Sequence, residues 1–178
     1  EQLLLQYQPV VNIRTGAVCG FEALARLKTE KLGLVLPFEF IPIAEKTKLI
    51  LNIGEKVIIS AFRFLNKLKE HGYDDVGVSI NISVLQLLHP DFADKLFEPI
   101  SEMQVNPGNV CIEITESVFA SDYESINKHL ERLRDAGMHV AIDDFGTGYS
   151  SLAREKELKV DFMKIDKYFI DKLMVEDL

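Results

Sequence analysis

The sequence lacks the features of a membrane-spanning or nucleic-acid-coating protein. Charged residues interrupt every apolar run well before the roughly 20 residues that a transmembrane helix needs. We see no signal peptide, because Glu1 leads directly into sequence with a structured pattern. Lysine and arginine total 20 against 28 aspartate and glutamate, and the net charge of -8 argues against nonspecific binding to nucleic acid or anionic lipid. We therefore expect no DNA partner and no membrane insertion.

Cysteine is scarce, and histidine shows no metal-binding pattern. The two cysteines, Cys19 and Cys111, are far apart, form no CxxC motif and occupy apolar, strand-like surroundings. They are interpreted as buried free thiols in a reducing compartment, which predicts a cytoplasmic domain. The four histidines are scattered without metal-ligand spacing. Neither residue type points to a zinc site.

The pattern of apolar residues indicates one α/β domain. At 178 residues and 47% hydrophobic content, the chain can bury one sizeable core but is short for two domains. Alternating runs predict helices over 54–71 and 122–136 and strands over 77–83, 109–116, 139–143 and 160–166. Strands that alternate with helices form right-handed βαβ units and a mainly parallel sheet. By contrast, residues 3–11 and 17–25 flank a turn signal and predict an antiparallel hairpin.

Polar residues fall at or near the carboxyl ends of five predicted strands. In parallel α/β folds, binding and catalytic groups gather at that end. Packing alone does not explain five strands that each deliver an oxygen or amine group to one rim. These residues are Glu22, Asn81, Glu113, Asp143 and Lys164.

The Asp143-Asp144 pair indicates a metal. Adjacent carboxylates at a strand end repel each other unless a cation or hydrogen-bond donors neutralise them. Together with Glu22, Asn81 and Glu113 they offer only oxygen ligands, which suit Mg²⁺ or Mn²⁺. Five ligands, one of them bridging, predict two metal ions about 3.5–4 Å apart, as used in phosphoryl chemistry. The glycines after the pair lack the spacing of a phosphate-binding loop.

Each of these residues also has a plainer structural interpretation. The Asp pair is compatible with a helix cap or turn, and Asn81 with a strand-end or capping role. Glu22 is equally compatible with a pair to Arg26, Lys164 with a surface pair to Asp166, and Glu116 with a cap on the segment near Ser117. Several independent coincidences of position would be needed for all of these interpretations to hold together.

The motifs together resemble the EAL domain family of cyclic di-GMP phosphodiesterases. Residues 21–26 (FEALAR) look like the signature that names the family, and residues 7–11 (YQPVV) like its opening strand. The resemblance covers essentially the whole chain, in order. It continues at 37–50, 79–83 (SINIS), 113–117 (EITES), 143–152 (DDFGTGYSSL) and 164–166 (KID).

The resemblance implies a fold and a set of roles. The expected fold is α/β, a modified TIM-like barrel with an antiparallel first strand, and residues 1–178 would be one partial EAL domain. Glu22, Asn81, Glu113 and Asp143 would bind one metal, and Asp143 with Asp144 a second, so the cofactors would be Mg²⁺ or Mn²⁺. The implied catalytic residues are Lys164, at the attacking water, and Glu116, which would anchor the loop 145–151. Gln8, Leu24 and Arg26 would contact substrate, with Arg26 near a phosphate.

The implied reaction is metal-dependent hydrolysis of cyclic di-GMP to linear pGpG in bacterial second-messenger signalling. The alternative is a catalytically inactive EAL domain that serves as a cyclic di-GMP receptor or protein-interaction module. The resemblance also implies a homodimer and flanking sensor or GGDEF domains in a longer parent protein. Two features depart from the family: its last two strands are absent, so we expect a fragment with an incomplete barrel, and residues 154–159 are unusually charged, which puts any dimer surface there in doubt.

Overall fold

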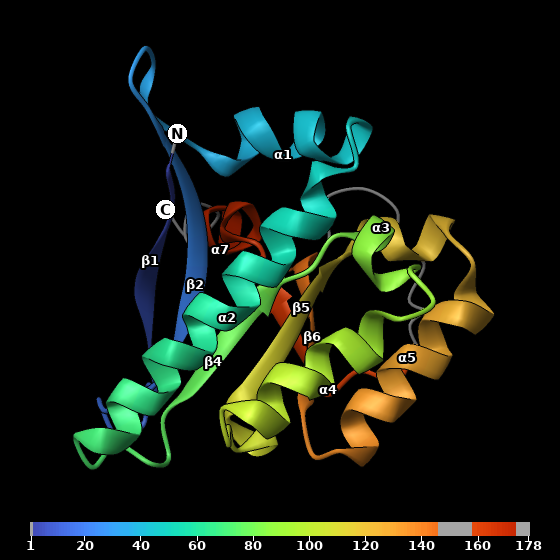
Figure 1. The fold of residues 1–178 in the computed structure, drawn as a ribbon. Helices are drawn as coiled ribbons and strands as arrows, with labels where there is room; N and C mark the ends of the chain where they lie inside the picture. The colour runs from blue at the N-terminus through green and yellow to red at the C-terminus, as the bar shows by residue number, and fades with distance from the viewer. Residues whose placement is uncertain (1, 146–157, 174–178) are drawn as a thin grey trace.

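The computed structural model describes residues 2–145 and 158–173. Strands and helices alternate along the chain after an initial hairpin (Figure 1). The strands are β1 (Gln2–Val11), β2 (Val18–Thr29), β3 (Gly33–Val35), β4 (Gly77–Asn81), β5 (Val110–Thr115), β6 (His139–Phe145) and β7 (Phe162–Ile165). The helices are α1 (Pro37–Lys46), α2 (Leu49–Glu70), α3 (Val84–Leu87), α4 (Phe92–Glu102), α5 (Tyr123–Asp135) and α7 (Lys167–Leu173), with short 3₁₀ turns η1 (Pro107–Asn109) and η2 (Glu116–Ala120).

The sheet follows the order β1-β2-β4-β5-β6-β7, and β3 pairs with β2. β1 is antiparallel to β2, whereas β2, β4, β5, β6 and β7 pair in parallel. Local chemistry explains the hairpin turn: the Asn12 side chain accepts hydrogen bonds from the backbone N–H groups of Arg14 and Thr15, and Gly16 adopts φ +71°. The sheet does not close on itself in the described part of the chain.

Helices α2, α4 and α5 cover one face of the parallel strands (Figure 1). Alternate strand residues on that face are completely buried and form the core with the helices, as Ile80, Ile112 and Ile142 illustrate. The opposite face, on the concave side, carries the polar residues of the candidate site. Because β-strand side chains alternate, burying one set against the helices dictates that the other set faces inward.

The predicted fold class is confirmed in its topology. The helices predicted over 54–71 and 122–136 appear as α2 and α5, the former beginning five residues earlier. Asp122 caps α5 by accepting from the Ser125 backbone N–H, and Gly72 and Gly137 end the two helices with positive φ. All six predicted strands are present, whereas β3, α1, α3, α4 and α7 had no counterpart in the periodicity analysis.

Two further expectations can be compared with the structure. Both cysteines are free, but the prediction that both are buried is wrong for Cys19, which is exposed near the start of β2. Cys19 lies close to the β1–β2 turn, and its sulfur donates to the Val10 carbonyl at 3.5 Å. None of the described helices combines the length and apolarity needed to cross a bilayer.

Candidate metal centre

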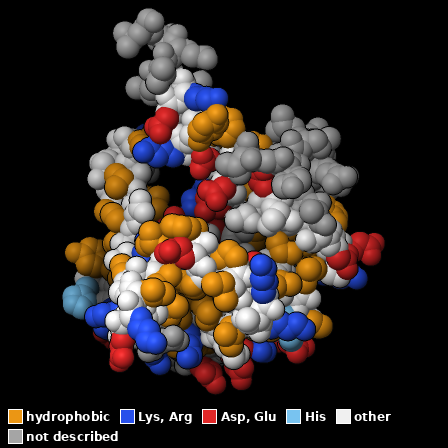
Figure 2. All heavy atoms as spheres, turned by 90° about the horizontal axis from the view of Figure 1, so that it is seen from above, with side chains coloured by type: hydrophobic (Ala, Val, Ile, Leu, Met, Phe, Trp, Pro, Cys, Tyr) orange, Lys and Arg blue, Asp and Glu red, His pale blue; other side chains and the backbone are white. Residues whose placement is uncertain are grey.

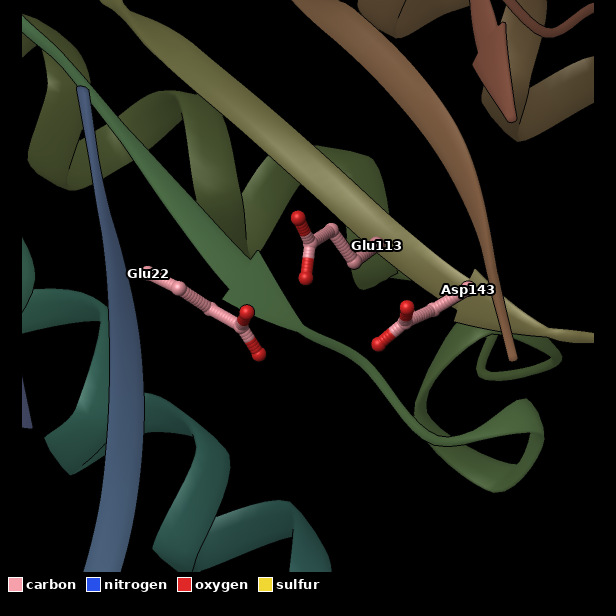
Figure 3. Close-up of side chains that lie close together, drawn as sticks. All are labelled: Glu22, Glu113 and Asp143. Carbon is pink, nitrogen blue, oxygen red and sulfur yellow. The ribbon is translucent and has the colours of Figure 1, made fainter. Parts of the chain in front are cut away.

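Three carboxylates from three strands converge on the concave side of the sheet. Glu22 projects from β2, Glu113 from β5 and Asp143 from β6, and one oxygen of each lies within 4.8 Å of the others (Figure 3). Seen from above, the surface is hollowed, and acidic and basic side chains gather at the hollow (Figure 2). The spacing of the three oxygens permits one cation to contact all of them.

Strand register explains why residues so distant in sequence meet. Asn81 pairs directly with Glu113 across β4 and β5, and Glu113 pairs with Ala141 across β5 and β6. Asp143 is two residues beyond Ala141, so it points to the same face one step closer to the rim. Asn81 joins the cluster directly, because its side-chain amide donates to Glu22 at 3.0 Å.

Lys164 lies among the three acids. Its Nζ is 2.7 Å from Glu113, 3.0 Å from Glu22 and 3.1 Å from Asp143. Burial disfavours the charged form, but the hydrogen bonds and charges of Glu113 and Glu22 outweigh this and raise the pKa of Lys164. Lys164 is therefore an ammonium ion at neutral pH.

Glu113 is the most enclosed of the acids, with 3% of its side chain exposed. Burial raises its pKa, while the hydrogen bond from Lys164 acts in the opposite direction. A buried carboxylate is costly unless it is paired, so Lys164 stabilises the ionised form of Glu113.

Asp144 is adjacent to the three-carboxylate group but is not a member of it. Its backbone is left-handed at φ +54°, and the β6–β7 register shifts between Ile142 and Phe145. Burial, followed by the charge of Asp143, raises the pKa of Asp144, so its carboxyl group lies near the site. A left-handed aspartate at this point breaks the strict alternation of strand side chains, which otherwise would send Asp143 and Asp144 to opposite faces.

The three predicted substrate residues share a face with Glu22. Glu22, Leu24 and Arg26 are alternate residues of β2, and Gln8 is the direct partner of Glu22 on β1. The Arg26 guanidinium donates to the backbone carbonyl of Ala25 at 2.8 Å. This row therefore extends from the acid cluster along the hairpin, although its contact with substrate stays a prediction.

Glu116 is buried at the first position of η2, directly after β5. The N-cap of that turn is Thr115, so the capping interpretation does not apply to Glu116. Most of the loop that it was predicted to anchor lies outside the described residues, as do residues 154–157 of the charged segment.

Several of the plainer interpretations of the remaining site residues are contradicted, but the strand-end interpretation of Asn81, the last residue of β4, is not. Glu22 pairs with Lys164 and Asn81, not with Arg26, and Lys164 pairs with the three acids, not with Asp166. The residue that caps α3 is Ser83, which leaves Asn81 free of that role. Asp143 lies within β6 and not in a helix cap.

A cavity of about 400 Å³ adjoins the cluster, and the sequence analysis assigned no role to most of its wall. Asn81 and Leu24 belong to both the cavity and the strand-end site. The remaining wall is largely apolar and comes from α1, α2 and the β4–α3 connection, including Phe38, Ile41, Pro42, Ile53 and Ile82. The apolar residues of α1 are visible in the sequence, but only the fold places them beside the acid cluster.

A sequence profile of the EAL domain matches residues 1–177. The chain belongs to the EAL domain family. It is 39% identical over 173 residues to the bifunctional diguanylate cyclase/cyclic di-GMP phosphodiesterase MucR of Pseudomonas aeruginosa, covering 97% of this chain and 25% of MucR. It is 36% identical over 170 residues to the probable cyclic di-GMP phosphodiesterase PdeI of Escherichia coli, covering 94% of this chain and 22% of PdeI.

The fold comparison agrees with the EAL assignment. The structure of the PaMucR phosphodiesterase in complex with cyclic di-GMP superposes with a TM-score of 0.90 at 38% identity, covering 98% of this chain and 70% of that one. The α/β, TIM-like class is thus confirmed, with an open sheet in the described part of this chain. The chain spans about a quarter of the length of the MucR and PdeI proteins.

Proposed function

We propose that this EAL domain, residues 1–178, acting within its parent protein, hydrolyses one phosphodiester bond of cyclic di-GMP to give linear pGpG in bacterial signalling. The chain alone, whose described sheet is open, would have little or no activity. The observation that carries the proposal is the convergence of Glu22, Glu113 and Asp143 on Lys164 at the carboxyl ends of the strands. The cyclic di-GMP phosphodiesterases MucR and PdeI, to which this chain is similar, support the substrate.

The donor set fits a divalent cation. Carboxylate oxygens within 4.8 Å of one another, with an amide side chain beside them, match the preference of Mg²⁺ and Mn²⁺ for oxygen. Glu22, Asn81, Glu113 and Asp143 would hold one ion, and Asp143 with Asp144 a second. When bound, such ions activate water and stabilise the charge that develops on the phosphoryl group.

In this proposal Lys164 lies at the attacking water and supplies a positive charge beside the three acids. It orients that water or neutralises charge on the phosphate. Gln8, Leu24 and Arg26 contact the nucleotide along the shared face of the hairpin, with the Arg26 guanidinium close to a phosphate. Glu116 anchors the loop after β6.

The test is direct. The parent protein that contains this domain, with its complete barrel, is incubated with cyclic di-GMP and Mg²⁺ or Mn²⁺, and products are separated by chromatography, with a parallel sample containing a chelator. We expect pGpG only in the metal-containing samples. Tight binding of cyclic di-GMP without any product would indicate a receptor and not an enzyme. Absence of binding would favour a protein-interaction module.

We also propose that the domain works as a cytoplasmic homodimer within a protein that carries sensor or GGDEF domains. The two free thiols are compatible with a reducing compartment. Size-exclusion chromatography with light scattering tests the dimer.

A further inference from the structure

Lys164 occupies the place where a cation would contact all three acids. Its Nζ is within 3.1 Å of an oxygen from each of Glu22, Glu113 and Asp143. These are the same three side chains whose oxygens lie within 4.8 Å of one another. Three carboxylates and one ammonium leave a formal charge of -2 (three negative charges less one), which is the charge that one divalent cation neutralises.

An ammonium and a divalent ion cannot both sit between these three oxygens. Magnesium binds oxygen at about 2.0–2.1 Å, so an ion held by the three carboxylates would lie well inside contact distance of the Lys164 Nζ. The two cations also repel each other, and in a partly buried site water screens that repulsion weakly.

The Lys164 side chain can move its ammonium group out of the acid cluster. It lies on β7, the last strand in the described sheet, and a third of its side chain is exposed. Its flexible four-carbon chain lets Nζ move toward solvent while one carboxylate still holds it. Glu113, at 3% exposure, has no such freedom, and a cation beside it stabilises its charged form.

We propose that Lys164 is a built-in counter-ion, which keeps the acid cluster assembled without metal and must be displaced to the edge of the cluster before a divalent cation binds. This inference rests on the metal site of the proposed function. It assigns Lys164 a second role as a positioning residue that lowers metal affinity and preserves the site between metal-binding events. The raised pKa of Lys164 agrees with an ammonium that is strongly held by the acids.

The experiment compares the wild-type protein with Lys164→Met, which keeps most of the length of the side chain and removes its charge. Mn²⁺ binding is measured by isothermal titration calorimetry, and Tm with and without Mn²⁺. We expect Kd for Mn²⁺ to fall about tenfold in Lys164→Met. Without metal its Tm should fall by about 5 °C, because three acids lose their counter-ion. Mn²⁺ should then raise its Tm more than that of the wild type.

Two further variants complete the design. Lys167→Met removes an exposed lysine from α7, whose partner is Asp171 at 3.8 Å, and should match the wild type in both measurements. Lys164→Arg keeps the charge and should bind Mn²⁺ no more tightly than the wild type, which tests the competition if Lys164→Met does not fold.

The outcomes separate the two proposals. Unchanged or weaker Mn²⁺ binding by Lys164→Met, or tighter binding by Lys164→Arg, would overturn the counter-ion role and leave the metal site intact. Absence of Mn²⁺ binding in the wild type and in Lys164→Met alike would overturn both.

Discussion

The two ends of the parallel strands each hold a network of ionic side chains, and the networks are balanced differently. At the amino end, Arg134 pairs with Asp161 at 2.9 Å, and the second Asp161 oxygen accepts the backbone N–H of Val140 at 3.0 Å. There one acid meets one base. At the carboxyl end, three acids share Lys164.

The difference separates a network whose charges balance from one whose charges do not. Asp161 ties β7 to β6 through both its carboxylate and its backbone N–H, which donates to the Val140 carbonyl at 2.8 Å. Its charge and both oxygens are satisfied, so the network needs nothing more. The strand-end cluster retains an excess of negative charge that raises the free energy of the folded state. Such uncompensated charge is retained where a ligand will neutralise it.

The largest expected effect is the loss of activity in Asp143→Asn, which disrupts the carboxyl-end network. It removes a carboxylate that would contact both metal ions, so cyclic di-GMP turnover should fall at least about 100-fold. The free energy of unfolding should change by less than about 1 kcal/mol, because relief of acid repulsion offsets the lost Lys164 pair. Turnover by chromatography and urea unfolding measure the two effects. Undiminished turnover would remove Asp143 from the site.

Asp161→Ala should give the opposite result at the amino end. The buried Val140 N–H loses its acceptor, so the free energy of unfolding should fall by about 2 kcal/mol. Arg134→Ala is the matched control, since it removes the ion pair alone and should cost at most about 1 kcal/mol. Mn²⁺ affinity should stay within about twofold in both. If Arg134→Ala costs as much as Asp161→Ala, the backbone hydrogen bond is not the main contribution.

The smallest expected effect is a difference in reactivity between the two cysteines. Cys111 is on the concave face two residues from Glu113, and burial followed by the Glu113 charge raises its pKa to about 12. Iodoacetamide at pH 8 should therefore modify exposed Cys19 before Cys111, which mass spectrometry can follow.

The same shift predicts how stability depends on pH. A thiol whose pKa rises on folding stabilises the folded protein below its unfolded pKa of 9.0, and that contribution is lost as pH increases from 9 toward 12. Urea unfolding of the wild type and Cys111→Ser across this range measures the contribution. Equal pH dependence in the two proteins would contradict burial of the Cys111 thiol as its cause.

Much of the fold and site was predictable because the signals are local. The 3.6-residue period of α2 and α5, their caps at Asp122, Gly72 and Gly137, and the Asn12 turn all act within a few residues. The short helix α3 was beyond the reach of periodicity, because four residues complete barely one turn. The exposure of Cys19 was missed because an apolar strand segment does not reveal whether another layer covers it.

The sequence by itself determined which residue types stand at the strand ends and that they suit a divalent cation. Strand alternation then dictated that Glu22, Glu113 and Asp143 face one side, because their neighbours had to be buried against the helices. Only the tertiary structure decided that Lys164, 142 positions after Glu22, lies at the centre of the acids and not beside Asp166. That choice depends on parallel pairing of strands distant in sequence, and no local preference encodes the distance between their side chains.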